Sequence, residues 1–277
     1  MSKLNISNNT VKSVLSEAAK EVVARKRINN IREKLIHENR FFADKSFLLA
    51  LEKLFEQSTT VIKKGTLFYR ARIYKEPDKP QKQLGIFEES DYEGYDEKGS
   101  FINLTSEWPI YGRMHPSGVR VLYTSSDSKT AAKELNPSVD ELVSIAIIIN
   151  DYDLRIADLS NTKFPNEYLD EDYEIKYILE LLSQGYSERE YVFSQYVAAY
   201  CANQGFDGIG YRSKYSRKSD TNKDNGVNYT IFNYQKCHPI SSKLYSIKNT
   251  SLQLNQIEPK LTHELINTKL NDINMLF

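Results

Sequence analysis

The chain has 277 residues, and its 37 Lys and Arg residues balance 37 Asp and Glu residues to a formal net charge of zero. A neutral balance argues against a broad nucleic-acid-binding surface, which needs a basic excess. The two cysteines, Cys201 and Cys237, argue against a disulfide scaffold, and no two cysteines or histidines have metal-ligand spacing. Residues 1–20 lack a signal-peptide core and no stretch is apolar enough to span a membrane, so a cytoplasmic location is expected.

The first sixty residues have the pattern of helices. Apolar residues recur at helical spacing over 11–35, and Asp44 is placed to cap a second helix with an apolar face over 47–55. No glycine occurs before Gly65. We therefore predict a helical hairpin or small bundle over residues 1–60 that packs against the domain that follows.

From Gly65 onward the pattern changes to short β-like runs separated by helices. The predicted strands are 66–73, 119–125, 142–149, 208–211 and 227–232. The predicted helices are a short one capped by Ser126 or Asp127, one over 174–182, and one that opens with a capping box at 187–190 and stops at Gly205. Because strands and helices do not alternate strictly, we predict an α+β fold with a mixed sheet over residues 61–242.

Two stretches have the composition of long loops. The first, 74–100, is charged and contains several glycines, and the second, 214–226, is rich in Lys, Ser, Asp and Asn. Long loops inside a compact domain often serve as lids. The tail, 243–277, is polar until Leu261, where a last amphipathic helix is expected.

Three arginines and a tyrosine are candidate ligands of a phosphorylated compound. Arg70 and Arg72 have the same parity on a predicted strand, so both can face one cleft and bind a pyrophosphate. The alternative is an exposed edge strand with solvated arginines. Arg113 could add a third phosphate contact, and Tyr123 could stack on a ring or bind a ribose.

A carboxylate and a hydroxyl complete the candidate site. Glu134 follows Ala131 and Ala132, whose small side chains let a ligand approach; the alternative is a solvated surface glutamate. Ser213 ends a glycine-rich strand, and its alternative is an ordinary turn serine. His115 has no evident nucleophile partner, so the sequence gives little support to a Ser-His or Cys-His mechanism.

Taken together, these segments resemble the RES-domain family, which is named for an Arg, a Glu and a Ser. The matching blocks are 67–72, 94–96, 112–113, 122–123, 130–134, 194–198, 205–213 and 226–229, in the same order and approximate spacing over residues 65–235. Arg70, Glu134 and Ser213 match the three name-giving positions.

The resemblance implies a fold similar to ADP-ribosyltransferases and an activity that consumes NAD+ as substrate, with no further cofactor and no metal. It assigns catalysis to Arg70, Glu134 and Ser213, and substrate binding to Arg72, Arg113, Tyr123 and Asn228. It also implies the toxin of a toxin–antitoxin pair, neutralised by a helix-turn-helix antitoxin. No membrane or nucleic-acid partner is expected, and homo-oligomer formation is left open.

The residue types suit cleavage of the nicotinamide–ribose bond. Nicotinamide needs no general acid to leave, and the barrier lies in an oxocarbenium-like ribose that Glu134 would stabilise. The acceptor could be water, inorganic phosphate or a protein side chain. Two alternatives therefore stay open: transfer of ADP-ribose to a macromolecule selected by the N-terminal helices, and a nucleotide-sensing module without turnover.

Overall fold

The computed structural model describes residues 8–75, 92–102, 111–160, 173–183, 191–215 and 226–247. Its helices are α1 (Asn8–His37), α2 (Lys45–Gln57), α3 (Glu97–Ser100), α4 (Ser128–Glu134), α6 (Tyr173–Ser183) and α7 (Tyr191–Asn203), with a 3-10 turn η2 (Tyr234–Lys236). Its strands are β1 (Thr59–Ile62), β2 (Leu67–Ile73), β3 (Leu122–Ser125), β4 (Leu142–Asn150), β5 (Leu154–Asp158), β6 (Gly208–Arg212), β7 (Val227–Ile231) and β8 (Cys237–Ser246).

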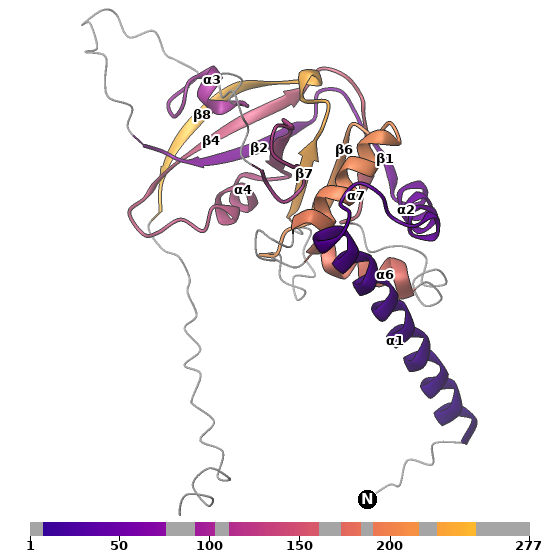
Figure 1. The fold of residues 1–277 in the computed structure, drawn as a ribbon. Coiled ribbons are helices and arrows are strands. Elements are labelled where there is room, and N and C mark those ends of the chain that lie inside the picture. Colours follow the sequence, from indigo (N-terminus) through magenta and orange to yellow (C-terminus); the bar gives the residue numbers. More distant parts are fainter. Residues whose placement is uncertain are drawn as a thin grey trace, which may run out of the picture.

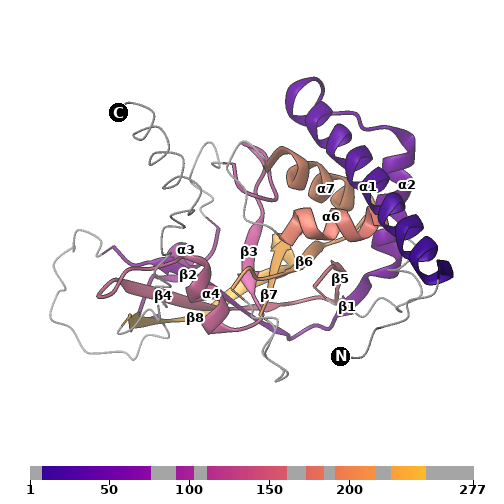
Figure 2. The ribbon, with the colours of Figure 1, turned by 90° about the horizontal axis from the view of Figure 1, so that it is seen from below.

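The strands form one eight-stranded sheet in the order β1-β5-β6-β7-β3-β2-β4-β8. All neighbours are antiparallel except β5 and β6, which run parallel. The sheet narrows at its centre, because β2 and β3 share one paired position, Tyr69 opposite Ser125. Figures 1 and 2 show β2, β4 and β8 on one side of this junction and β1, β5 and β6 on the other. The predicted α+β class with a mixed sheet is confirmed.

The N-terminal helices share a core with the sheet. Helices α1, α2, α6 and α7 gather over one end of it (Figures 1 and 2). Ile28, Leu35, Phe47 and Leu51 from α1 and α2 are at most 1% exposed and belong to one cluster with residues of α6, α7 and β6. Ion pairs from α1 to α6 add to this contact, including Arg25 to Glu180 at 2.8 Å. The N-terminal helices therefore pack against the following domain, as predicted.

Most predicted elements are confirmed, with shifts of a few residues at their ends. The predicted cap of the second helix is present, since the Asp44 carboxylate accepts a hydrogen bond from the Phe47 N–H at 2.8 Å. The predicted strand 119–125 is shorter, since β3 begins only at Leu122. Sequence patterns missed β1, β5 and β8, and β8 continues to Ser246, beyond the expected boundary at residue 242.

Several predictions fall on residues outside the described ranges. They are the capping box at 187–190, most of the loops 74–100 and 214–226, and the helix expected from Leu261. Among the described residues, no helix combines the length and the apolar character needed to cross a membrane.

Candidate active site

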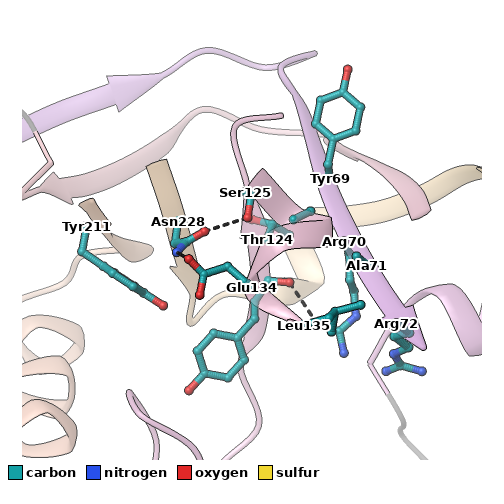
Figure 3. A pocket seen from close by; sticks show the side chains of 12 residues that line it. Tyr69, Arg70, Ala71, Arg72, Thr124, Ser125, Glu134, Leu135, Tyr211 and Asn228 are labelled. Carbon is teal, nitrogen blue, oxygen red and sulfur yellow. Dashed lines mark hydrogen bonds between the residues drawn. The ribbon is translucent and has the colours of Figure 1, made fainter. Parts of the chain in front are cut away.

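A pocket of about 360 Å³ opens where the sheet narrows, a size typical of small-molecule sites. Its walls come from β2, β3, α4, β6 and β7. The lining residues are Tyr69, Arg70, Ala71, Arg72, Tyr123, Thr124, Ser125, Ala131, Glu134, Leu135, Tyr211 and Asn228. Figure 3 shows Arg70 and Arg72 extending to the same side of β2, whereas Tyr69 points away from Glu134. The pocket thus unites two arginines and the carboxylate that the sequence had placed on separate elements.

Helix α4 brings Glu134 to the pocket, and its position is fixed at its first turn. Asp127 caps the helix: its carboxylate accepts from the Thr130 N–H and from the Thr130 hydroxyl, both at 2.7 Å. Burial opposes the charge of Asp127, but these hydrogen bonds outweigh it and hold its pKa below the ordinary value. A Cβ at Gly226 would overlap the Thr130 side chain, so glycine lets the start of β7 lie against α4.

Neutral donors hold the Glu134 carboxylate. Its Oε1 accepts from the Ser213 hydroxyl at 2.6 Å and from the Asn228 side-chain amide at 2.7 Å. The Asn228 Oδ1 in turn accepts from the Ser125 hydroxyl at 2.7 Å (Figure 3). Ser213, Asn228 and Ser125 are 3%, 6% and 4% exposed, so the side chains that hold the carboxylate are polar and buried. Within the described residues, no cation pairs with Glu134.

Arg70 presents an incompletely satisfied cation to the same pocket. Its Nη1 donates to the backbone carbonyl of Tyr123 at 3.0 Å, while its Nε is buried without a hydrogen-bond partner among the described residues. Burial and the nearby charge of Arg72 lower the pKa of the Arg70 guanidinium to about 9, which leaves it cationic at neutral pH. A buried cation with unused donors is suited to an anionic ligand.

Arg72 lines the pocket, but backbone carbonyls occupy its guanidinium. Its Nη1 donates to the Gly99 carbonyl at 2.5 Å and its Nη2 to the Phe101 carbonyl at 2.7 Å. Burial lowers the pKa of Arg72 as well. The predicted shared face of Arg70 and Arg72 is confirmed, and the contacts give Arg72 the role of an anchor for the segment that contains α3.

The Tyr123 hydroxyl is similarly engaged by the protein. It accepts a hydrogen bond from the Met114 N–H at 2.9 Å and lies 2.9 Å from the His115 Nδ1. Burial raises the pKa of Tyr123 well above its ordinary value. The ring remains a wall of the pocket, and His115 has a tyrosine partner.

Arg113 is not among the residues that line the described pocket. It donates to the Leu182 carbonyl at the end of α6, and its guanidinium carbon lies 5.1 Å from the centre of the Tyr211 ring. Tyr211 does line the pocket and is 7% exposed. Arg113 therefore contacts a wall of the pocket through Tyr211, and the third phosphate contact expected of Arg113 stays a prediction.

Sequence reasoning missed Ser125 and Tyr211. Strand register reveals them: Ser125 lies opposite Asn228 on β3 and β7, and Asn228 lies opposite Tyr211 on β7 and β6. In β6, Ile209 and Tyr211 alternate with Gly208 and Gly210, so their side chains project to the same face of the strand. This alternation was the signal in the sequence that could have indicated Tyr211. Among the described residues, no cluster of His, Cys, Asp and Glu is suited to a metal ion.

The RES domain family model matches residues 90–248, more than half of the chain, so the protein belongs to the RES-domain family. Glu134, Ser213 and Asn228 lie within the match, and Arg70 precedes it. Among solved structures, the chain is similar to one in the crystal structure of the M. tuberculosis MbcT–MbcA toxin–antitoxin complex. That match has 10% identity and a TM-score of 0.38, and covers 73% of this chain and 93% of the other. No curated protein sequence matches the chain.

Proposed function

We propose that this protein cleaves the nicotinamide–ribose bond of NAD+ and acts as the toxin of a toxin–antitoxin or defence system. The proposal rests on two opposite charges that face the same pocket. The Arg70 guanidinium and the Glu134 carboxylate both line it, and they do not form an ion pair with each other. NAD+ has the complementary distribution, an anionic pyrophosphate and a cationic nicotinamide riboside. Membership of the RES-domain family supports the same substrate.

In the proposed reaction, Arg70 binds the pyrophosphate and so fixes the ribose relative to Glu134. The bond between the ribose C1′ and the nicotinamide nitrogen breaks, and its electron pair leaves with neutral nicotinamide. Positive charge develops on the ribose, opposite Glu134. Ser213 and Asn228 both donate to Oε1, and no described residue donates to Oε2, so one carboxylate oxygen can face the ribose.

The remaining ADP-ribosyl group needs an acceptor. Water gives free ADP-ribose and inorganic phosphate gives ADP-ribose 1″-phosphate. The polar groups around the pocket hold the Glu134 carboxylate and the two arginines, so we do not assign the acceptor to them. Water and phosphate can enter the pocket from solvent. Hydrolysis or phosphorolysis is therefore the proposed outcome, with transfer to a macromolecule and binding without turnover as the results that would replace it.

A single incubation of purified protein with doubly labelled NAD+ tests the proposal. Release of labelled nicotinamide without labelled protein supports degradation, and adding phosphate separates hydrolysis from phosphorolysis by the mass of the product. Label on a macromolecule means transfer, and saturable binding without nicotinamide release means a sensor. Glu134→Gln is the control for a contaminating hydrolase.

The toxin role is tested in bacteria. Induced expression should stop growth while cellular NAD+ falls, and co-expression of the helix-turn-helix antitoxin that the resemblance implies should restore both. Growth arrest with constant NAD+ would contradict NAD+ depletion as the cause.

A further inference from the structure

A row of side chains crosses the sheet beneath Glu134. Ser125 on β3 lies directly opposite Asn228 on β7, and directly opposite residues of antiparallel strands project to the same face. Both residues are more than nine-tenths buried. The proposed function assigns a reaction to Glu134 alone among these groups, so the role of the row must be read from its hydrogen bonds.

The direction of each hydrogen bond in the row is fixed by chemistry. An ionised carboxylate only accepts, so the Asn228 group that faces Glu134 Oε1 at 2.7 Å must be the Nδ2 amine. The Oδ1 end then faces the Ser125 Oγ at 2.7 Å, and the serine must donate. Both ends of the Asn228 side chain are therefore bound to protein groups.

An amide side chain is nearly symmetric in shape but not in hydrogen bonding. Rotation of the Asn228 amide by half a turn would place Oδ1 against the Glu134 carboxylate, acceptor against acceptor, so the carboxylate sets the orientation of the amide. A serine hydroxyl can donate or accept, and in this orientation the Ser125 hydroxyl donates to Oδ1. Ser125 thus holds the far end of the amide and steadies the Nδ2 group that donates to Glu134.

We propose that Ser125 is a positioning residue, which acts through Asn228 to hold the Glu134 carboxylate in its reactive place. This inference rests on the proposed function for its kinetic consequence, and on the hydrogen bonds for its structural one. It also gives Asn228 a positioning role, and the substrate contact that the resemblance implies for Asn228 stays a prediction.

Kinetics of NAD+ cleavage test the inference. Removing the hydroxyl leaves the buried Asn228 amide oxygen without its donor, so the amide that donates to Glu134 is held less firmly, and Ser125→Ala should lower kcat about tenfold with KM changed by less than about twofold. Ser125→Thr keeps the hydroxyl and should keep most of kcat. Ser58→Ala removes another buried serine hydroxyl, bonded to the Phe55 carbonyl away from the pocket, and should leave kcat unchanged.

A double-mutant cycle distinguishes a merely structural role of Ser125 from a role that acts through Glu134. If Ser125 acts through Glu134, Ser125→Ala should have no further effect on kcat in the Glu134→Gln background. An equal loss in both backgrounds, or a wild-type kcat for Ser125→Ala, would overturn the inference.

A second measurement does not depend on activity. Selective ¹⁵N-asparagine labelling gives the Asn228 side-chain amide signal, assigned by its loss in Asn228→Ser. That signal should move on Ser125→Ala and on Glu134→Gln, and stay fixed on Ser58→Ala. If the chemical shift of the Asn228 amide is unchanged by Ser125→Ala, the inference is overturned, even in a protein without NAD+ turnover. Absence of turnover in the wild type, with the signal moving as expected, would overturn only the proposed function.

Discussion

The Arg70 guanidinium donates to the backbone carbonyl of Tyr123 at 3.0 Å, and so joins β2 to β3 where these strands share a single paired position. The residue that faces the pocket with unused donors also links the two parts of the sheet. A ligand bound at Arg70 would therefore be coupled to the geometry of the junction on which Tyr123 and Ser125 lie.

Lysine should not replace Arg70. It retains the charge but has one donor centre, so it cannot hold both the Tyr123 carbonyl and a pyrophosphate in a fork. We expect Arg70→Lys to lower kcat/KM by about tenfold or more. Arg72→Lys loses one of the two bonds to the Gly99 and Phe101 carbonyls. This variant should have a lower Tm and a KM close to that of the wild type. Wild-type kinetics for Arg70→Lys would show that Arg70 acts as a point charge only.

Glu134→Gln should fold normally and lose nearly all NAD+ cleavage. The substitution preserves shape and removes the negative charge opposite the developing ribose cation, at a cost of about 10²-fold or more in kcat. Nicotinamide release at saturating NAD+ measures the loss, and an unchanged Tm confirms the fold. A folded Glu134→Gln protein that keeps most of its activity would remove Glu134 from the mechanism.

Gly226→Ala should displace α4 and lower both Tm and kcat, because the new Cβ would overlap Thr130 in the first turn of the helix that ends with Glu134. Gly65→Ala is the matched control. Gly65 has a positive φ of 86° but open space around it, so its substitution costs about 1 kcal/mol of strain without touching the pocket. The hypothesis fails if both variants change kcat equally.

Asp207 should make stability depend on acid pH. Burial opposes its charge, but hydrogen bonds from Lys236 at 2.7 Å and Asn233 at 2.6 Å outweigh this and lower its pKa. A lowered carboxylate pKa adds stability above the unfolded pKa near 3.8, and that stability is lost as pH falls through the folded pKa. Urea unfolding should show Asp207→Asn about 1–3 kcal/mol less stable at pH 7, with a deficit that shrinks as the pH falls below the unfolded pKa of 3.8. A deficit that stays constant with pH would contradict the assignment.

Phe47→Ala should destabilise the whole protein. Phe47 on α2 is fully buried and packs against Phe193 on α7 with ring centres 5.8 Å apart. Loss of such a side chain costs about 3–5 kcal/mol. Phe42→Ala removes a phenylalanine that is 79% exposed and should leave Tm unchanged. Equal Tm values for Phe47→Ala and wild type would show that α2 folds independently of the sheet.

The sequence predicted the long, periodic elements and missed strands that lack a clear pattern. Strand β4 is almost continuously apolar and β2 carries matching alternation, so both were found. Strand β1 has four residues and is mostly exposed, and β8 contains Pro239, which normally argues against a central strand. β8 accommodates the proline because it lies at the edge of the sheet.

For the site, residue type and spacing left solvated alternatives open for Arg70 and Glu134, and the resemblance to the RES-domain family selected them. The hydrogen-bond partners of the site residues could be identified only in the folded chain. The carbonyls that occupy Arg72, and the α6 end that binds Arg113, are backbone groups that no sequence pattern marks. Ser125 became visible only through the register of β3 against β7.

The donors that hold Glu134 lie 79 and 94 positions later in the chain. During synthesis, Arg70 and Glu134 leave the ribosome long before β6 and β7 exist, and the carboxylate lacks its support until Asn228 has emerged and paired with β3. An incomplete chain therefore has no assembled pocket. The proposed consumption of a nucleotide of the cell would then begin only after most of the sheet has formed, which would leave an interval during translation in which a partner could be made and be ready to bind.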